Sequence, residues 1–553
     1  MKIKKLLSLF LAAALVLSFG GCMKREENPD EENLPEVTEE DELVLYHNNT
    51  ELAPMLMALT EKYSSETGKK LSAKLAGNDF MGEMQSSSGA IYVVDSHADL
   101  SNWHSGGLFT DLMNHSGFSE MLQGVPAGLQ LNPDGIGSYG IPLALEGFGY
   151  IFDREMISAL FGEENTNEIV EDLRSCSFTD FESFVAAADS YIASPSEAKI
   201  TLNGNEYTFL PEKTGKAAML TGVFALNSES SRASEHLLSY VLASKFKSRY
   251  EIMTAPEEAV AGLDKILSSY MEALDLQTSH IAGVEGNISR GDEFIGGDYN
   301  YSTSIDLLTR GNALFYPGGT SDAADFEKSA EGFSENLDII PMKLPVSEDE
   351  ITASGMTAEK LNSSIVISSR YYIAVNPKAD ENSSAAAREF INWLYNEESG
   401  RKAYSEAFKA VPFNFEYLMT GQENSVPETE NSSEAPEPEN PSPENSSEPS
   451  SENSASEGTG KSGTEQNPGI ETRPSHSVSN SLMAAVADYY AKGNWIPDMS
   501  FALPGDFSEK VLGKNLGDFW GMENWAEADR KNFIEKFIEG WRERINKENT
   551  AVG

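Results

Sequence analysis

The spacing of apolar residues near the start of the chain alternates between that of short strands and that of a helix. Residues 43–46, 70–75 and 90–95 are short apolar runs, and apolar side chains lie three and four residues apart between Thr50 and Gly68. Thr50 is placed as the N-cap of this helix and Gly68 as its stop. Strands that alternate with helices predict a mostly parallel sheet, whose ligands bind beyond the carboxyl ends of its strands.

Residues 140–152 form an apolar segment with one internal charge, Glu146. Aromatic residues then occur at every second position, as Phe148, Tyr150 and Phe152. A period of two is that of a strand. Strand and helix patterns alternate before this segment, whereas long helical patterns follow it. We therefore predict a strand that crosses between two lobes, with Glu146 and several aromatic rings in the cleft between them.

The second half of the chain mixes helical and extended patterns. Thr179 and Glu182 predict a capping box for a helix that carries phenylalanines on one face. Further helices are predicted at 233–246, 263–276, 385–395, 482–490 and 532–545. Strands are predicted at 337–340, at 364–375 and at the end of 307–317, while Trp495–Pro497 is predicted to be a loop.

The first residues have the pattern of a secretory signal. Three lysines precede an apolar run from Leu6 to Phe19, which is too short to span a bilayer comfortably, and two glycines precede Cys22. We predict that residues 1–21 are a lipoprotein signal peptide and that Cys22 becomes the lipid-modified first residue. The alternative is ordinary secretion, with Cys22 lost or unpaired.

Two tracts lack the apolar residues that a core requires. Residues 22–42 are rich in Glu, Pro and Asn, and residues 422–477 consist mainly of Ser, Glu, Pro and Asn. Both are predicted to be disordered, the first as an acidic tether and the second as an insertion within the fold. Loop-closure entropy grows slowly with length, so the insertion is tolerable whether it is neutral, a spacer or a docking loop for a partner.

The composition excludes several classes of protein. The chain has 553 residues with 41 basic and 88 acidic side chains, a net charge of −47, so it cannot neutralise the phosphates of a nucleic acid. Its only other cysteine, Cys176, has no partner for a disulfide if Cys22 is lipidated. The sequence contains no nucleophile elbow, His-Glu-x-x-His motif or phosphate-binding loop. We therefore predict a binding protein without catalytic residues or cofactor.

Several motifs, in the right order, resemble the extracellular solute-binding proteins of ABC importers, especially those for sugars and oligosaccharides. They are Leu45–His47 with the helix to Gly68, Gly107–Leu112, Tyr139–Pro142 through Asp153, Gly311–Leu314, and Phe390–Leu394 through Pro412. The chain departs from the family pattern at Thr320, where many sugar binders have tryptophan, and at Ser363-Ser364, which replaces a usual pair of glycines.

The resemblance implies an α/β fold of the periplasmic-binding-protein type II, with two discontinuous lobes that are joined by hinge strands and close over a ligand. It implies an N-terminal lobe of residues 43–150 and 302–345, and a C-terminal lobe of residues 151–301 and 346–553. It also implies a monomer on the extracytoplasmic face of a bacterial membrane, held by its lipid anchor, that delivers a sugar or oligosaccharide to an ABC permease.

Sugar recognition needs flat apolar faces for the pyranose ring and polar groups for its hydroxyls. Residues of both kinds stand at predicted strand ends and form the expected site: Asn48, Asn49, Asp95, Trp103, Glu146, Tyr150, Tyr316 and Trp495. Trp103 lies in a Ser/Gly-rich loop, which favours exposure. Trp393 lies among apolar neighbours on a helix and is expected in the core.

Other ligand chemistries have weaker signals. Asp95, His97, Asp99 and His104 are close in sequence, but a strand-end loop does not ensure that metal ligands converge, so no metal site is predicted. The pair Tyr371-Tyr372 is similar to the tyrosines of iron-binding relatives, yet neighbours in a strand point to opposite faces.

Three alternative functions remain open at this point. The first is a sensory or scaffold lipoprotein with the same fold and no transport role. The second is a binding protein for another solute, such as a metal or a polyamine. The third is a surface glycoside hydrolase that pairs Glu146 with another acid.

Overall fold

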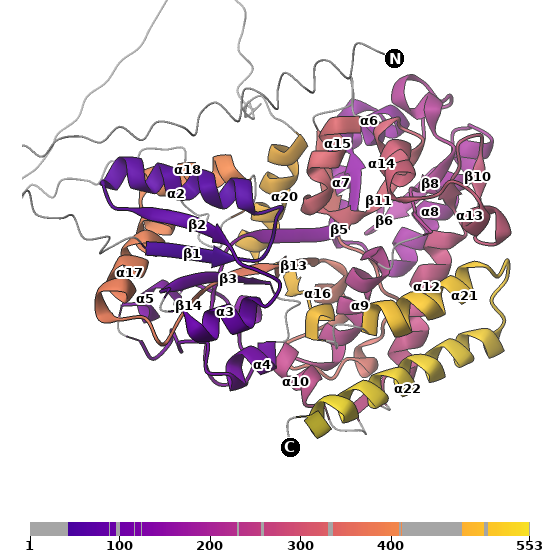
Figure 1. Ribbon diagram of the computed structural model, residues 1–553. Coiled ribbons are helices and arrows are strands. Elements are labelled where there is room, and N and C mark those ends of the chain that lie inside the picture. Colours follow the sequence, from indigo (N-terminus) through magenta and orange to yellow (C-terminus); the bar gives the residue numbers. More distant parts are fainter. Residues whose placement is uncertain are drawn as a thin grey trace, which may run out of the picture. The chain divides into compact units, whose positions relative to one another are not determined.

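The computed structural model describes residues 43–411 and 478–551, apart from gaps at 88, 96–99, 116, 123, 229–231, 256–258, 261, 330–335, 409–410 and 503–506. The predicted signal peptide, Cys22, the tether and the insertion therefore lie outside the described residues. The described chain forms two large sheets, each covered by helices (Figure 1). Within it, no helix combines the length and the apolar character needed to cross a membrane.

The first sheet has the strand order β2-β1-β3-β14-β4. Its strands are β1 (Leu43–His47), β2 (Leu71–Leu75), β3 (Ile91–Asp95), β4 (Ile141–Pro142) and β14 (Tyr371–Val375). Strand β1 is parallel to β2 and β3, so their carboxyl ends share one edge, whereas β14 runs antiparallel to β3. The predicted strand–helix alternation thus produces the expected parallel core.

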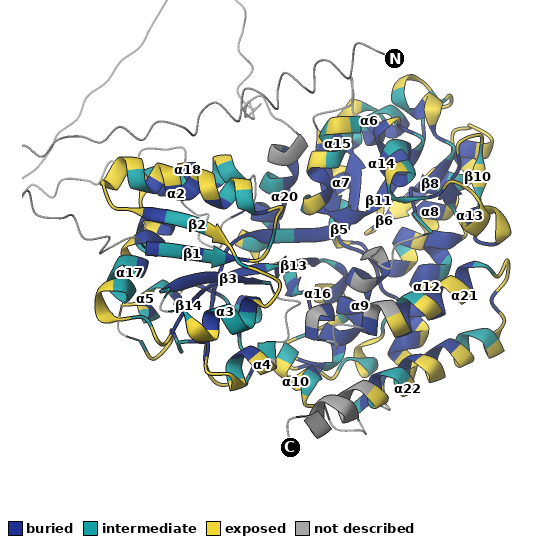
Figure 2. Cartoon of the chain, viewed as in Figure 1, coloured by how far each residue is buried: buried dark blue, intermediate teal, exposed yellow. Residues whose placement is uncertain are grey.

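Helices cover both faces of this sheet. On one face lie α2 (Ala53–Thr67), α17 (Glu381–Asn396) and α18 (Glu398–Phe408); on the other lie α3 (Phe80–Ser86) and α4 (Leu100–Ser105). Trp393 of α17 is buried and packs edge-on against Tyr63 of α2, as predicted. Figure 2 shows that the strands of the two sheets are largely buried beneath the helices. Tyr371 and Tyr372 belong to the two different apolar clusters on opposite faces, also as predicted.

The C-terminal end of α2 agrees with the prediction, but its N-terminal end differs. Gly68 ends the helix in the left-handed conformation, with φ 72°. Asn49, rather than Thr50, holds its start, because the Asn49 Oδ1 atom accepts hydrogen bonds from the backbone N–H groups of Glu51 (2.7 Å) and Leu52 (3.1 Å).

The second sheet has the order β10-β9-β8-β11-β5-β13-β15, with β12 paired to β5 as well. Its strands are β5 (Leu145–Asp153), β8 (Gly222–Phe224), β9 (Ile281–Ala282), β10 (Asn287–Ile288), β11 (Ala313–Gly319), β12 (Leu337–Ile340), β13 (Ile365–Ser369) and β15 (Trp495–Pro497). A separate hairpin consists of β6 (Lys199–Leu202) and β7 (Asn205–Thr208). Residues 495–497, which we expected to form a loop, are an edge strand parallel to β13.

The helices of the second lobe include most of those predicted. They are α6 (Arg154–Phe161), α7 (Thr166–Ser175), α8 (Phe178–Ala193), α9 (Arg232–Lys245), α10 (Arg249–Met253), α12 (Asp264–Thr278), α13 (Asp292–Gly296), α14 (Tyr301–Thr309), α15 (Ala323–Ser329), α16 (Ala358–Asn362), α20 (Val478–Lys492), α21 (Lys514–Trp520) and α22 (Glu527–Ala551). The N-cap of α8 is Ser177, whose side chain accepts from the Asp180 N–H, so the predicted capping box at Thr179 is wrong.

Strand β5 is at the centre of the second sheet. Its two glycines allow close approach from both sides: a Cβ on Gly149 would lie 2.3 Å from the Ile340 carbonyl of β12, and one on Gly147 would lie 2.3 Å from Val486 of α20. Tyr150 and Phe152 are buried. The prediction that the aromatic rings of this strand line a cleft is therefore wrong for Tyr150 and Phe152, whose rings pack beneath helices of the second lobe.

The chain crosses between the two sheets just before β5. One crossing is Pro142–Leu145, and another is Ser369–Tyr371, between β13 and β14. The two crossings are bonded to each other, because the Leu143 N–H donates to the Tyr371 carbonyl at 2.8 Å. The Leu145 N–H also donates to the Val411 carbonyl at 2.9 Å. The hinge is thus shorter than predicted and Glu146 stands at its end.

Strand pairing also corrects the predicted lobe boundaries. Strands β11 and β12 pair with β5, so residues 302–345 do not belong to the first lobe. Strand β14, α17 and α18 pack with the first sheet. Among the described residues, those within 43–142 and 371–408 belong to the first lobe, and those within 145–369 and 478–551 belong to the second. An apolar strand pattern shows that a strand exists but not which sheet it joins, because that depends on pairing with residues far away in the sequence.

Candidate functional site

Polar side chains gather where the first-lobe strands end and the hinge begins. Tyr371 is the register partner of Asp95, at the end of β3. The Asn49 Nδ2 atom donates to the Tyr371 hydroxyl at 2.6 Å, and the Arg370 Nε atom lies 3.4 Å from Asp95 Oδ2. The Arg370 guanidinium also lies over the Tyr371 ring, 5.1 Å from its centroid. We call Asn49, Asp95, Arg370 and Tyr371, together with Glu146, the strand-end cluster.

Glu146 contributes to the electrostatics of this cluster. It is half-buried and is the register partner of Ser368, two residues before Arg370. Burial by itself lowers the pKa of Arg370, but the negative charges of Asp95, Glu146 and Glu51 together with Tyr371 outweigh it, so the net pKa is raised. Burial raises the pKa of Tyr371, although Arg370 opposes this shift. The cluster therefore presents a cation, a neutral phenol, carboxylates and an amide.

His47 supports the turn that carries the two predicted asparagines. It is buried at the end of β1, and its Nδ1 atom lies 2.9 Å from the Asn49 carbonyl oxygen. Burial lowers the pKa of His47, while its bond to the Asn49 backbone raises it by a smaller amount. The neutral imidazole thus holds the turn in which the Asn49 side chain faces Tyr371. Asn48, in the same turn, is exposed.

A small cavity lies on the second-lobe side, at the carboxyl ends of β8 and β11. It is lined by Phe148, Asn227, His236, Tyr301, Tyr316, Pro317, Gly318, Gly319 and Asp322. Glu146 and Phe148 are two residues apart on β5 and so share a face of the sheet. The His236 ring stacks on Phe148 at 3.6 Å between centroids. The start of β5 therefore connects this cavity with the strand-end cluster.

Hydrogen bonds hold the polar wall of the cavity in place. The Tyr301 hydroxyl shares its one proton between Asp322 (2.8 Å) and Asp325 (3.0 Å), and the Gly319 N–H donates to Asp322 at 3.0 Å. Burial and the two carboxylates raise the pKa of Tyr301, so it stays a neutral donor. Tyr316 packs edge-on against Phe326 behind the same wall.

The structure brings together only some of the predicted ligand residues. Asn49, Asp95 and Glu146 join the strand-end cluster, and Tyr316 lines the cavity. Trp495 is half-buried on the edge strand β15 and stacks on Tyr490, with 5.6 Å between ring centroids.

Two predicted residues lie in the core instead. The expectation that Trp103 is exposed is wrong: α4 turns it onto the sheet, where it packs with Phe80, Tyr92 and Phe109. Tyr150 is buried, and its hydroxyl accepts a hydrogen bond from Gln277 at 2.8 Å.

Several site residues were missed from the sequence. Arg370 is the one charged residue within the apolar segment 364–375, which is the same signal that marked Glu146. His236 and Asn227 carry no such signal, because a helix and a strand end place them at the cavity only through tertiary packing.

The described residues contain no group of three His, Cys, Asp or Glu side chains placed to hold a metal ion. His97 and Asp99 lie outside them. Of the other two candidates, Asp95 pairs with Arg370, and His104 Nε2 lies 3.5 Å from Asp134 Oδ2.

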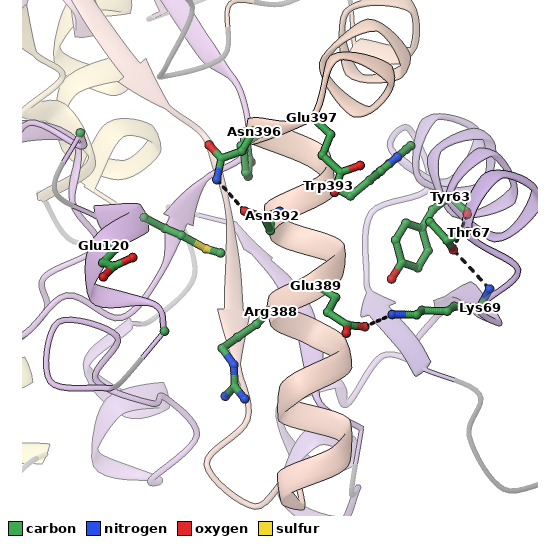
Figure 3. A pocket seen from close by; sticks show the side chains of 14 residues that line it. Tyr63, Thr67, Lys69, Glu120, Arg388, Glu389, Asn392, Trp393, Asn396 and Glu397 are labelled. Atoms are coloured by element: carbon green, nitrogen blue, oxygen red, sulfur yellow. Dashed lines mark hydrogen bonds and ion pairs between the residues drawn. The ribbon is translucent and has the colours of Figure 1, made fainter. Parts of the chain in front are cut away.

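A second pocket, of about 700 Å³, lies on the first lobe beside α17 (Figure 3). Lys69, which pairs with Glu389, precedes β2, so the pocket is at the amino end of the strands, opposite the strand-end cluster. Asn396 donates to Asn392 at 2.9 Å on the same helix. Because ligands of open parallel sheets bind at the carboxyl ends of the strands, we place the candidate site at the strand-end cluster and the cavity.

Comparisons with known proteins agree with this architecture. The profile of a family described as bacterial extracellular solute-binding protein matches residues 60–427. No curated protein matches the chain.

Solved structures are similar in fold at low sequence identity. A family 1 extracellular solute-binding protein from Bifidobacterium longum subsp. infantis has a TM-score of 0.51 and 12% identity, covering 91% of this chain and 98% of that one. The apo-form of RafE from Streptococcus pneumoniae has a TM-score of 0.50 and 10% identity, covering 91% and 97%. The bacterial solute receptor AcbH, described with an exclusive preference for β-D-galactopyranose, has a TM-score of 0.51 and 9% identity, covering 91% and 99%.

Proposed function

Because the chain belongs to the family of bacterial extracellular solute-binding proteins, we propose that it binds a sugar or oligosaccharide between its lobes and delivers it to an ABC permease. The observation that carries this proposal is the strand-end cluster, which places an amide, a phenol, a guanidinium and carboxylates around the hinge. Planar polar groups of this kind bond the hydroxyls of a sugar, and the sugar preference described for AcbH supports the same ligand class.

The hinge supports a role for lobe closure. Within the described residues, two short crossings join the sheets and the cluster lies at their ends. A ligand that bonds both lobes would therefore favour the closed arrangement. No catalytic step is proposed.

Ligand screening tests the proposal directly. Thermal unfolding of the purified protein against a panel of mono- and oligosaccharides, polyamines and divalent metals should show stabilisation by a carbohydrate, because a ligand that binds only the folded state raises the midpoint. The Arg370→Ala variant should lose this stabilisation. The control variant Asn392→Ala, in the pocket of Figure 3, should retain it. Stabilisation by a polyamine or a metal alone would overturn the sugar assignment.

Lipid anchoring and transport are separate parts of the proposal. Metabolic labelling with a palmitate analogue should mark the wild-type chain and not Cys22→Ala, which should leave the membrane fraction. Deletion of the protein should abolish uptake of the identified sugar. Normal uptake together with a lost transcriptional response to that sugar would favour the sensory alternative.

A further inference from the structure

The cavity contains a histidine that is oriented by a buried carboxylate. His236 and Asp498 are 5% and 0% exposed in their side chains, and His236 Nδ1 lies 3.3 Å from Asp498 Oδ2. Asp498 follows β15, whereas His236 belongs to α9, so the two residues are close only through the packing of the second lobe. Among the described residues, neither of these two buried atoms makes a hydrogen bond of good geometry, so this close contact is the polar interaction of both.

The other oxygen of Asp498 is fully engaged. Its Oδ1 atom accepts hydrogen bonds from the Ser239 hydroxyl (2.8 Å), the Ser500 hydroxyl (2.5 Å) and the Ser500 N–H (2.9 Å). These bonds fix the carboxylate and direct Oδ2 at the imidazole. Burial by itself raises the pKa of Asp498, but His236, Ser500 and Arg249 outweigh it and the net pKa lies far below the usual range. Asp498 is therefore a fixed anion.

The imidazole is held on its other faces as well. Its ring stacks on Phe148, and the cavity borders it beside Asn227 and Tyr316. Because Nδ1 faces Asp498, Nε2 is the ring nitrogen that remains for the cavity. The charged and titratable groups around it are Asp498, Arg249 (whose Nε donates to the Asp498 carbonyl at 3.0 Å), Tyr301, Tyr316 and Asp322.

We infer that His236 contacts the ligand, an inference that rests on the proposed function. Asp498 is then a positioning residue that keeps the proton of the His236 imidazole on Nδ1. The Nε2 lone pair then accepts a hydrogen bond from one hydroxyl of the sugar, which enters the cavity. The cavity has room for about one water molecule or hydroxyl group. The ligand is thus a sugar whose unsubstituted hydroxyl, at the end of the molecule facing the second lobe, enters this cavity.

Variants at His236 separate a contact from a structural role. In His236→Gln, the amide oxygen can take the place of Nε2 as the hydrogen-bond acceptor, so affinity at pH 8 should stay within about threefold of wild type. In His236→Asn, the shorter amide keeps a partner for Asp498 and leaves the cavity empty, so affinity should fall about tenfold at pH 8. Equal affinities for wild type and His236→Asn would overturn the contact, and thermal unfolding checks that both variants fold.

Asp498→Asn tests the positioning role. The carboxamide can donate to Nδ1 and move the imidazole proton to Nε2, so affinity at pH 8 should fall about tenfold. Asp189→Asn is the matched control, because Asp189 lies 3.4 Å from His280 in another Asp–His pair of the second lobe, and neither residue lines the cavity. This control should behave as wild type.

A ligand-free measurement distinguishes failure of this inference from failure of the proposed function. Nitrogen-15 NMR of the imidazoles at pH 8 should show His236 as the Nδ1–H tautomer in the wild type and as the Nε2–H tautomer in Asp498→Asn. An Nε2–H tautomer in the wild type would overturn the positioning role even if sugars bind. Absence of binding by every carbohydrate would overturn the ligand class and the proposed function, while the tautomer would still decide the role of Asp498.

Discussion

The two lobes contribute side-chain pairs to the site that differ in burial. In the first lobe, the side chains of Arg370 and Asp95 are 32% and 23% exposed, at 3.4 Å. In the second lobe, His236 and Asp498 are nearly inaccessible, at 3.3 Å. A partly exposed pair contributes little to stability and can exchange its partner for a ligand, whereas a buried pair is costly to break. The side chains of the first-lobe pair can therefore rearrange around a ligand, whereas those of the second-lobe pair are fixed before the ligand binds.

The largest expected effect is on stability and comes from removing the carboxylate of the buried His236–Asp498 pair. Asp498→Ala leaves His236, Ser239 and Ser500 without their acceptor, and the free energy of unfolding should fall by about 3–5 kcal/mol. Asp95→Ala, the matched change on the first lobe, should cost less than about 1 kcal/mol. Urea denaturation measures both, and equal losses would contradict the contrast between the lobes.

A smaller effect is expected on binding rather than stability. Arg370→Leu removes the cation that balances Asp95, Glu146 and Glu51, so sugar affinity should fall by roughly tenfold or more through loss of a charged hydrogen-bond donor, worth about 1.5–3 kcal/mol. Calorimetric titration provides the measurement. Arg388→Leu, in the pocket of Figure 3, is the control, and a similar loss there would place the ligand in that pocket.

The hydrogen bond between Asn49 and Tyr371 tests how much the strand-end cluster contributes to the stability of the first lobe. Tyr371→Phe removes the acceptor of the Asn49 amide and should lower the unfolding free energy by about 0.5–1.5 kcal/mol. A double-mutant cycle with Asn49→Ala isolates this pair. A coupling energy of zero would mean that the bond does not contribute in solution.

The smallest expected effect is the pH response of His47. Burial lowers its folded pKa below the unfolded value of about 6.5, so the unfolded chain binds the proton more readily. The stability that the neutral ring contributes at pH 7 is therefore lost as the pH falls through the folded pKa. Between pH 7 and pH 5 the wild type should lose more unfolding free energy than His47→Gln, and a parallel loss in both proteins would exclude this role for His47.

The sequence predicted local structure well where a pattern is carried by neighbouring residues. The strands near Leu43, Lys70 and Ala90, the stop at Gly68 and the packed position of Trp393 follow from spacing and turn chemistry, and the structure has them. Glu146 stood out because it is a lone charge in an apolar strand. Arg370 shows the same signal and could have been found in the same way.

Errors arose where a side chain's neighbours come from distant parts of the chain. The Ser/Gly-rich surroundings of Trp103 suggested a loop, but a short helix turns the ring onto the sheet. The aromatic alternation of Phe148, Tyr150 and Phe152 correctly predicted a strand, yet it could not show that helices cover both faces of that strand.

The amino-acid sequence by itself determined the strand–helix alternation, the crossing with its lone carboxylate and the class of protein, because periodicity and motif order depend on residues close together in the chain. Only the tertiary structure decided which strands share a sheet, where the lobes divide, and that Asp498 faces His236 across 262 positions of sequence. Burial and pairing of such groups depend on contacts between segments that no local pattern connects, and those contacts set the charges and hydrogen bonds of the site.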